Sequence, residues 1–524
     1  MLKIASFAVA FGLITGQALA ATLVVNSTAD DGTAGTLRYE LGIAQPGDTI
    51  TFSLPANSTI QLTNQTVRVP TLNITKSLSI VGPGSSQLTI KAYSPALNSA
   101  YDVFDVYEPA TPATINVSIS GLTIQNANEA VWGGGGAPGA PLTISLQGVN
   151  LLNNYYAGAE FDYGTAGTIA QSTISGNNYG VEVYSDATDP TSAATISQST
   201  IAHNAVGIYN TYSNVTVTNS TLFANGSASM NGVSAELTED LNANATLAFS
   251  TIDGASSTGT PGLLALDPSA TFTLKSTILA GHPAGNCVLD STPVSSAGFN
   301  LDSDGSCALN GSADQSGTAS APLAAGLAGA LASNGGPTQT DALAAAGPAI
   351  DWIPTSNCTD AQGQPVTVDQ RNSTRPAGQG CDIGAYEYQN TSTPISVSLQ
   401  LSGYPPSAAN FSLVASFATG ASINPASQVV GLQIGAYNLS IPAGSFKQLQ
   451  GGSKTGSWVY SSVINGVTLN IQIVNNGNGT YQFKANGGTV NVGSQTPVAV
   501  EITIGSFVGT GSNATAVKPL LHQN

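Results

Sequence analysis

The sequence predicts an all-β protein, with a right-handed parallel β-helix followed by a C-terminal antiparallel β-sandwich. A short phrase recurs seven times between residues 114 and 283, at intervals of 21 to 30 residues. Such a period is typical of a solenoid, in which each repeat packs only against its neighbours. Around each copy, Thr, Ile and Val alternate with Ser and Asn, which is the pattern of short strands. After residue 390 the repeat gives way to longer alternating segments, which indicate a second β-domain.

One position in each copy of the phrase defines its register. These register positions are Thr123, Asn150, Thr173, Thr200, Thr221, Thr251 and Thr277. An aliphatic residue follows every one of them, and another stands four residues before the first six, whereas the seventh copy has Thr273 there. A coil of about 25 residues accommodates three strands of about five residues with their turns. Stacked coils then pair in parallel about 4.8 Å apart, which predicts a parallel β-helix.

An asparagine column supports the same architecture. Asn154, Asn177, Asn204 and Asn225 stand four residues after the register position in four consecutive copies. Stacked Asn side chains at a turn can hydrogen-bond to one another along the axis. The alternative is that Asn merely suits turns because it tolerates left-handed backbone. Because the four residues are in register, we expect a ladder.

Residues 1–20 have the pattern of a secretory signal peptide, with Lys3, an apolar run and Ala18-Leu19-Ala20 before the expected cut after Ala20. No other run is long and apolar enough to predict a transmembrane segment. We therefore expect a secreted or cell-surface protein that begins at Ala21, and we expect a monomer.

Positive charge is scarce in this chain. The formal net charge is −17, and no Lys or Arg occurs between Lys91 and Lys275. Such a surface argues against nucleic acids and other polyanions as partners, because nothing neutralises their charge. The three His residues, at positions 203, 282 and 523, lie far apart in sequence, so we expect no histidine-based metal site and no cofactor.

The N-terminal segment, residues 21–91, is expected to cap the first coil of the β-helix. Residues 36–44 place Leu37, Leu41 and Ala44 on one face of a short helix that can cover the open end. The TLR at 36–38 and the PGDTI at 46–50 make this stretch resemble the start of bacterial right-handed β-helix repeat proteins. The coils would then occupy residues 92–297.

Six motifs follow the coils in a fixed order. They are GFNLDSDGSC (298–307), NGGPTQTDAL (334–343), GPAID (347–351), DQR (369–371), RP (375–376) and CDIGAYE (381–387). Together they resemble the choice-of-anchor Q domain, which closes the β-helical region of many exported bacterial proteins. The resemblance implies a cap over residues 298–390 and an exported protein, but no reaction. The usual anchor does not follow; residues 391–524 do.

The four cysteines and a charge cluster lie close to or within this cap. Export makes disulfides the default, and four cysteines allow three pairings. We expect Cys287–Cys307 and Cys358–Cys381, because each closes one loop of an irregular region. Arg371 and Arg375 stand among four acidic residues: Asp351, Asp369, Asp382 and Glu387. We expect buried ion pairs that hold the cap, formed by Asp369, Arg371, Arg375 and Asp382, with a catalytic site as the alternative.

Residues 391–524 predict the β-sandwich. Alternating runs at 429–435, 437–442, 458–464, 467–474, 480–485 and 498–505 are separated by turn residues. Strands at this spacing with polar outer faces are typical of two packed antiparallel sheets.

One face of the coils holds the candidate ligand-binding residues. Aligning Gly158, Gly180 and Gly207 points Glu160, Glu182 and Tyr209 outward on adjacent coils, with Asp162 and Tyr184 two residues further along. Trp132 is expected one coil below. Adjacent rungs would bring Glu160 and Glu182 to about 5 Å at the backbone, which raises the pKa of one of them. The alternative is a solvated face whose tyrosines cover the sheet.

Three functions fit these observations, because one fold hosts them all. We expect a non-enzymatic interaction, adhesion or structural protein, whose partner is a neutral glycan or a cell-surface protein. The alternative is a carbohydrate-active protein that binds glycans or hydrolyses glycosides. The absence of cations from Ala92 to Leu274 argues against a lyase of acidic polysaccharides, which needs cations to neutralise the uronate.

Overall fold

The computed structural model describes residues 20–63, 70–93, 101–109, 113–135, 141–226, 232–255, 259–290, 294–344, 347–389, 393–402, 408–419, 423–449, 456–464, 466–493, 497–505 and 507–513. The expected signal peptide lies outside this part of the chain, apart from Ala20. No helix among the described residues is both long and apolar enough to cross a membrane.

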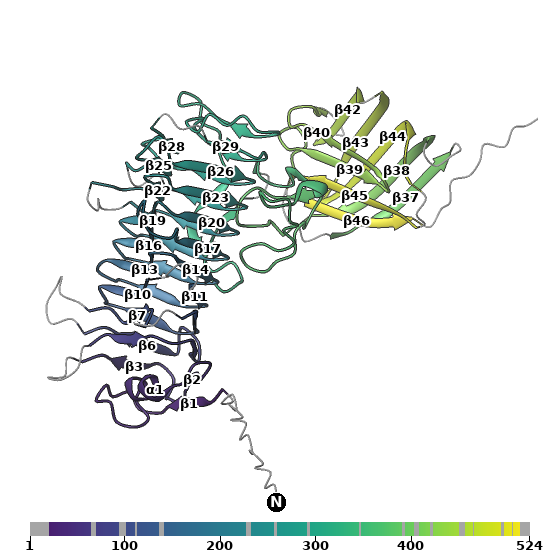
Figure 1. The fold of residues 1–524 in the computed structure, drawn as a ribbon. Coiled ribbons are helices and arrows are strands. Elements are labelled where there is room, and N and C mark those ends of the chain that lie inside the picture. Colours follow the sequence, from purple (N-terminus) through teal and green to yellow (C-terminus); the bar gives the residue numbers. More distant parts are fainter. Residues whose placement is uncertain are drawn as a thin grey trace, which may run out of the picture.

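Three parallel sheets wrap around one apolar core and form the β-helix (Figure 1). Each full coil contributes one strand to each sheet. Sheet 1 comprises β1 (Thr22–Val25), β2 (Thr49–Phe52), β5 (Leu78–Val81), β8 (Ile115–Ser120), β11 (Leu142–Gln147), β14 (Thr165–Ala170), β17 (Ala193–Ser197), β20 (Asn214–Thr218), β23 (Asn244–Ala248), β26 (Thr271–Lys275) and β29 (Ser295–Ser296).

Sheet 2 comprises β3 (Ser58–Gln61), β6 (Leu88–Lys91), β9 (Thr123–Gln125), β12 (Asn150–Leu152), β15 (Thr173–Ser175), β18 (Thr200–Ala202), β21 (Thr221–Phe223), β24 (Thr251–Asp253), β27 (Ile278–Ala280), β30 (Leu301–Asp302) and β31 (Gln315–Ser316). Sheet 3 comprises β4 (Leu72–Ile74), β7 (Phe104–Tyr107), β10 (Glu129–Gly134), β13 (Ala157–Asp162), β16 (Tyr179–Tyr184), β19 (Val206–Thr211), β22 (Leu237–Glu239), β25 (Leu263–Ala265) and β28 (Cys287–Val288).

The predicted register is confirmed for the first six copies of the phrase. Their register positions pair side by side along sheet 2, from Thr123 through Thr200 to Thr251. The residues that follow them, such as Ile174 and Ile201, are fully buried in the core.

The seventh copy is shifted by one residue from our alignment. Thr251 pairs with Ile278 instead of Thr277, and Leu274 pairs with Leu247. This shift restores an aliphatic residue at the position where the alignment had Thr273. A left-handed corner residue stands two positions before the register position in every copy: Gly121, Gly148, Gln171, Gln198, Asn219, Phe249 and Ser276. The corner marks the register, and it is occupied by glycine, amide, aromatic and hydroxyl residues alike.

The asparagine ladder is confirmed. Nδ2 of Asn154, Asn177 and Asn204 each donates to Oδ1 of the Asn in the next coil, at 2.8 to 2.9 Å. The same oxygens accept the backbone N–H of the preceding Asn. The neighbouring strands carry glycine beside the ladder because a Cβ on Gly180 would lie 2.4 Å from the Gly207 carbonyl oxygen and 2.9 Å from Asn204 Nδ2.

The open end of the first coil is covered by α1 (Leu37–Ile43), as predicted. The Thr36 hydroxyl caps the helix by accepting the Tyr39 N–H at 3.3 Å. Leu37, Leu41 and Ala44 are buried in the core of the β-helix.

The segment after the coils folds back along the outside of sheet 2. It contains β32 (Leu327–Ala332), β33 (Thr340–Leu343), β34 (Ile353–Pro354), a 3-10 helix (Thr355–Asn357) and β35 (Gly380–Cys381). Gln370 inserts its side chain between coils: Nε2 donates to the Ser199 carbonyl at 3.1 Å, and Oε1 accepts the Thr221 hydroxyl at 2.6 Å. Further along, the Ala385 N–H donates to Thr251 Oγ1. Both predicted disulfides, Cys287–Cys307 and Cys358–Cys381, are present.

Two sheets with antiparallel pairing, apart from the short β36, form the C-terminal domain, which extends away from the cap end of the β-helix (Figure 1). One sheet has the order β36 (Thr393–Pro394), β46 (Phe507–Asn513), β45 (Val498–Ile504), β39 (Val430–Ile434) and β40 (Tyr437–Ile441). The other has the order β37 (Ser396–Ser402), β38 (Ala409–Ala418), β44 (Thr480–Val490), β43 (Val467–Gly477), β42 (Ser457–Ile464) and β41 (Lys447–Leu449). Both sheets contribute to a single apolar core, as in a sandwich.

Candidate functional site

The outer face of sheet 3 carries a continuous polar and aromatic column. Asp105, Trp132, Glu160, Glu182 and Tyr209 are register partners on the consecutive strands β7, β10, β13, β16 and β19. The residues between them in sequence, such as Val181 and Ile208, face the core. The structure thus brings Trp132, Glu160, Glu182 and Tyr209 together on one face, in the register expected from the sequence.

A second column runs beside the first, two residues further along each strand. Asp162, Tyr184 and Thr211 are register partners, as expected. The Trp132 indole N–H donates to Asp162 Oδ2 at 3.2 Å and so ties the two columns together. Tyr184 is partly exposed and meets the exposed Tyr163 edge to face, with ring centroids 5.8 Å apart.

The carboxyl groups on this face are buried, in contrast to the solvated surface that was our alternative. Glu160, Asp162 and Glu182 are 9%, 6% and 6% exposed. One oxygen of each receives no hydrogen bond from the described residues: Oε2 of Glu160, Oδ1 of Asp162 and Oε2 of Glu182. Side chains on a parallel sheet are stacked at intervals of about 4.8 Å, so each carboxyl is covered by the rungs above and below it.

Tyrosine rings line one side of the carboxyl column. Tyr156 meets Tyr179 edge to face at 5.3 Å between centroids, and Tyr179 meets Tyr209 at 5.5 Å. The Tyr156 hydroxyl donates a hydrogen bond to the Glu182 carboxyl, and the Tyr209 hydroxyl donates to Asp240 at 3.0 Å. This side of the column is therefore apolar along the rings and polar at their tips.

Sequence reasoning missed three acidic members of the site: Asp102, Asp105 and Glu129. Asn128 Nδ2 bridges Asp102 and Glu129, at 3.2 Å from each. Asp105 lies one coil before the first copy of the phrase, so the repeat alone did not reveal it. The alternating FDVY of residues 104–107, which resembles the strand around Glu160, is the signal that could have found it.

Burial makes this cluster hold protons at neutral pH. It raises the pKa of Glu182 to about 7 and that of Asp105 to about 7. Burial, reinforced by the negative charges of Glu129, Asp162 and Glu182, raises the pKa of Glu160 far above its ordinary range. Protonated Glu160 shares hydrogen bonds with Glu129 and Asp162. No Lys or Arg among the described residues forms an ion pair with this group.

The arrangement combines groups that accept and groups that donate protons at neutral pH. Glu160 is protonated and can donate, whereas Glu182 titrates near neutrality and can do either. The described residues contain no group of three or more His, Cys, Asp or Glu side chains placed to hold a metal ion. The cluster can therefore form hydrogen bonds to hydroxyl groups and can take part in acid–base chemistry.

The charge cluster of the cap differs from our expectation in one partner. Arg371 pairs with Asp369 at 2.6 Å, and Arg375 pairs with Glu387 at 2.7 Å. The Asp382 carboxylate instead accepts hydrogen bonds from the backbone N–H groups of Asp351 and Tyr388. The backbone carbonyl oxygen of Asp382 accepts a hydrogen bond from Arg375 Nη1. Glu387 thus replaces Asp382 as the partner of Arg375. These groups are buried and, apart from Arg375 Nε, hydrogen-bonded within the described residues, which is typical of a structural network.

Comparison with known proteins agrees with the fold. A family model described as "Right handed beta helix region" matches residues 116–305. No curated protein matches the chain. A solved structure, the tailspike protein gp49 from Acinetobacter baumannii bacteriophage Fri1, is described as a capsular polysaccharide depolymerase. It aligns at a TM-score of 0.28 and 9% identity, over 86% of this chain and 80% of that one, a likeness that carries no argument about activity. The coils of this chain therefore form a parallel β-helix, and the central ones match that family model.

Proposed function

We propose that this protein is secreted or held at the cell surface and recognises a neutral glycan on the outer face of sheet 3. The observation that carries the proposal is the group of buried carboxyls of Glu160, Asp162 and Glu182, which forms no ion pair with a described Lys or Arg and lies between Trp132 and the row of tyrosines.

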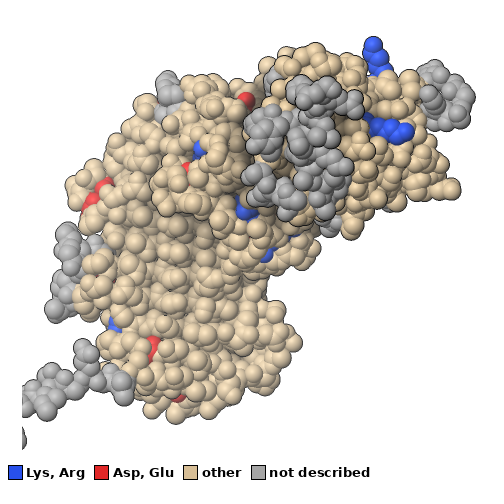
Figure 2. All heavy atoms as spheres, turned by 90° about the vertical axis from the view of Figure 1, so that its right-hand side faces the viewer, with Lys and Arg blue, Asp and Glu red and all other residues tan. Residues whose placement is uncertain are grey.

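Sugar chemistry fits both parts of this surface. The faces of aromatic rings pack against the C–H groups of a sugar ring, and carboxyl oxygens accept hydrogen bonds from its hydroxyls. Acidic glycans do not fit, because no Lys or Arg lies between Lys91 and Lys275 to neutralise them. Figure 2, which shows the right-hand side of the view in Figure 1, has only scattered Lys, Arg, Asp and Glu side chains on the visible face of the β-helix.

Glycoside hydrolysis is the second candidate function, and the pKa values of the carboxyls favour it. A glycosidase needs one carboxyl that is protonated at the working pH and a second that is ionised. Protonated Glu160 faces Glu182, whose pKa of about 7 allows the ionised form. In this variant of the proposal, Glu160 protonates the leaving oxygen and Glu182 acts as base or nucleophile.

The proposal is tested on an array of neutral and acidic glycans, with release of reducing ends measured on the same glycans. We expect neutral glycans to bind wild-type protein and the Glu182→Ala/Tyr209→Ala double variant to lose the signal. Tyr155→Ala is the matched control, because Tyr155 is exposed and stands outside the column. Unchanged binding by the double variant would show that the protein does not recognise glycans through this face of sheet 3. Reducing ends released by wild type but not by Glu160→Gln would establish hydrolysis, and binding without release would rule it out.

The proposed location rests on two further features. The two disulfides are compatible with an extracellular protein, and residues 298–390 resemble the choice-of-anchor Q domain. We propose a mature monomer that begins at Ala21. N-terminal sequencing of protein from the culture medium and its mass by light scattering test these two points.

A further inference from the structure

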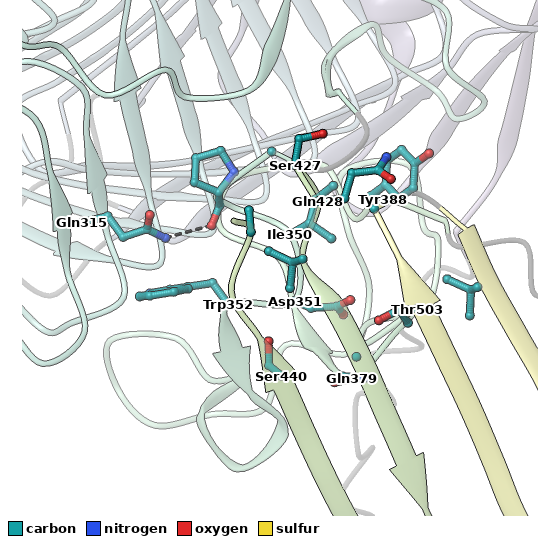
Figure 3. Close-up of a pocket in the computed structure, with 17 residues that line it drawn as sticks. Gln315, Ile350, Asp351, Trp352, Gln379, Tyr388, Ser427, Gln428, Ser440 and Thr503 are labelled. Carbon is teal, nitrogen blue, oxygen red and sulfur yellow. Dashed lines mark hydrogen bonds between the residues drawn. The ribbon is translucent and has the colours of Figure 1, made fainter. Parts of the chain in front are cut away.

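A concave site lies between the cap and the C-terminal domain, and it shares no residue with the column on sheet 3. It is a cavity of about 380 Å³. Asp351, Trp352 and Gln379 reach it from the cap, and Gln428, Ser440 and Thr503 reach it from the C-terminal domain (Figure 3). Cavities of this size at the junction of two domains are common ligand sites.

Trp352 forms an aromatic wall at one side of this cavity. Its side chain is unusually open for a tryptophan, at 44% exposure. The indole N–H donates to the Ala313 carbonyl at 2.7 Å, which holds the ring by its edge and leaves its face free. Figure 3 shows the ring on one side of the cavity, Thr503 and Gln379 on the other, and Asp351 between them.

Uncharged hydrogen-bonding groups complete the lining. Within the described part of the chain, the Ser440 and Thr503 hydroxyls form no hydrogen bond, so both remain available to a ligand. Asp351 is the single charged residue of the lining, and its Oδ1 accepts the Gly380 N–H at 3.1 Å. None of the lining residues is Lys or Arg, so an anionic ligand would find no counter-charge.

The two domains meet closely over one glycine. A Cβ on Gly431 of β39 would lie 2.2 Å from Thr503 Oγ1 and 3.1 Å from Gln379 Nε2. Gly431 therefore leaves the space in which an amide from the cap and a hydroxyl from the C-terminal domain lie together. A ligand that contacts both groups would bridge the two domains.

We propose that this cavity binds one or two units of a neutral sugar, stacked on Trp352 and hydrogen-bonded by Asp351, Ser440 and Thr503. The volume suits a ligand of that size, the free indole face suits sugar C–H groups, and the neutral amides and hydroxyls suit sugar hydroxyls. The site shares no residue with the column on sheet 3, so this proposal can be tested independently of the proposed function.

The test uses the full-length mature chain and an array of neutral oligosaccharides, with hits confirmed by saturation-transfer NMR. Trp352→Ala should lower the affinity for at least one hit by tenfold or more. Thr503→Val keeps the β-branched shape and removes only the hydroxyl, so it should weaken the same glycan by roughly three- to tenfold. Trp132→Ala reports binding at sheet 3. Tyr39→Ala is the matched control, because it removes an exposed aromatic ring from α1, outside both candidate sites, and should leave this glycan unaffected.

A stability measurement guards against misfolded variants. The bound glycan should raise the melting temperature of wild-type protein, and the increase should be smaller for Thr503→Val. The proposal is overturned if no neutral glycan binds, if acidic glycans compete equally, or if the signal depends on Trp132 and not on Trp352 and Thr503. Loss of sheet 3 binding alone would overturn the proposed function and leave this site intact.

Discussion

Glu160 and Glu182 lie directly opposite one another on adjacent parallel strands, and both carboxyl groups are buried. Like charges in this position repel, and burial penalises the charged form of each. The fold tolerates the pair because the groups keep protons that exposed carboxyls would lose at neutral pH.

The first prediction concerns stability against pH. The pKa of Glu182 rises from 4.5 to about 7 on folding, so the folded state binds the proton more tightly than the unfolded chain. Its stabilising contribution is complete below pH 4.5 and is lost as the pH rises through 7. Wild-type protein should therefore lose up to about 3 kcal/mol between pH 4.5 and pH 8 through this group.

Glu182→Gln should flatten this dependence and should be more stable than wild type at pH 8. Urea unfolding at several pH values measures both effects. Asp186→Asn is the control, because Asp186 is a nearby carboxylate whose pKa is lowered by hydrogen bonds to Thr188. If the free energy of unfolding depends on pH in the same way for wild type and Glu182→Gln, Glu182 does not have the raised pKa on which this prediction rests.

The second prediction concerns the core of the coils. Ile201 is fully buried and pairs with Ile174 and Leu222. Ile201→Asp buries an unpaired carboxylate, so it should destabilise the protein by roughly 4 kcal/mol or more, or prevent soluble expression. Thr195→Asp, which places the same charge on the exposed face of β17, should be close to wild type in thermal unfolding.

The third prediction tests the asparagine ladder. Asn204→Ala removes the acceptor of the Asn177 N–H and Nδ2–H groups and leaves them buried without partners. We expect a loss of about 2 to 4 kcal/mol in the free energy of unfolding. Asn178→Ala changes the partly exposed asparagine that follows Asn177 and removes only the hydrogen bond it donates to the Tyr155 carbonyl, so it should cost less. Equal effects of the two substitutions would show that the ladder adds nothing beyond a turn preference.

The fourth prediction concerns the disulfides. Cys287–Cys307 and Cys358–Cys381 close loops of 20 and 23 residues. Replacing either pair by serine should cost about 3 kcal/mol if the effect is the entropy of the unfolded chain. Denaturant unfolding of each double variant, with and without reductant, measures this loss. A reductant that still destabilises the variant lacking both pairs would indicate another cause.

Sequence reasoning succeeded where burial dictates residue type. Core positions such as Ile201 must be aliphatic, so their spacing revealed the coils. It failed at Thr277, because the true register is set by the left-handed corner at Ser276, and corners in this protein are occupied by residues as different as glycine and phenylalanine. Local composition therefore does not mark the corner.

The candidate site was predicted only in part for a similar reason. Strict alternation from the inward Val131 would turn Glu129 toward the core, yet Glu129 pairs with Ala157, whose column lies outside the main core. Alternation counted from Val131 therefore does not extend to Glu129. Burial of Glu160 and Glu182 depends on neighbouring rungs, which no single strand reveals.

The attachment of the cap to sheet 2 determines how the β-helix comes apart. A stack of coils held only by nearest neighbours can fray one coil at a time from its end. Here Gln198 donates to the Asp369 carbonyl, 171 residues later in the chain, and Ala385 donates to Thr251, 134 residues earlier. The last-synthesised part of the solenoid thus fastens onto coils made long before it. Before coils can unfold from that end, the hydrogen bonds between the cap and sheet 2 must break. The coils that these bonds join should therefore unfold together, as one cooperative unit.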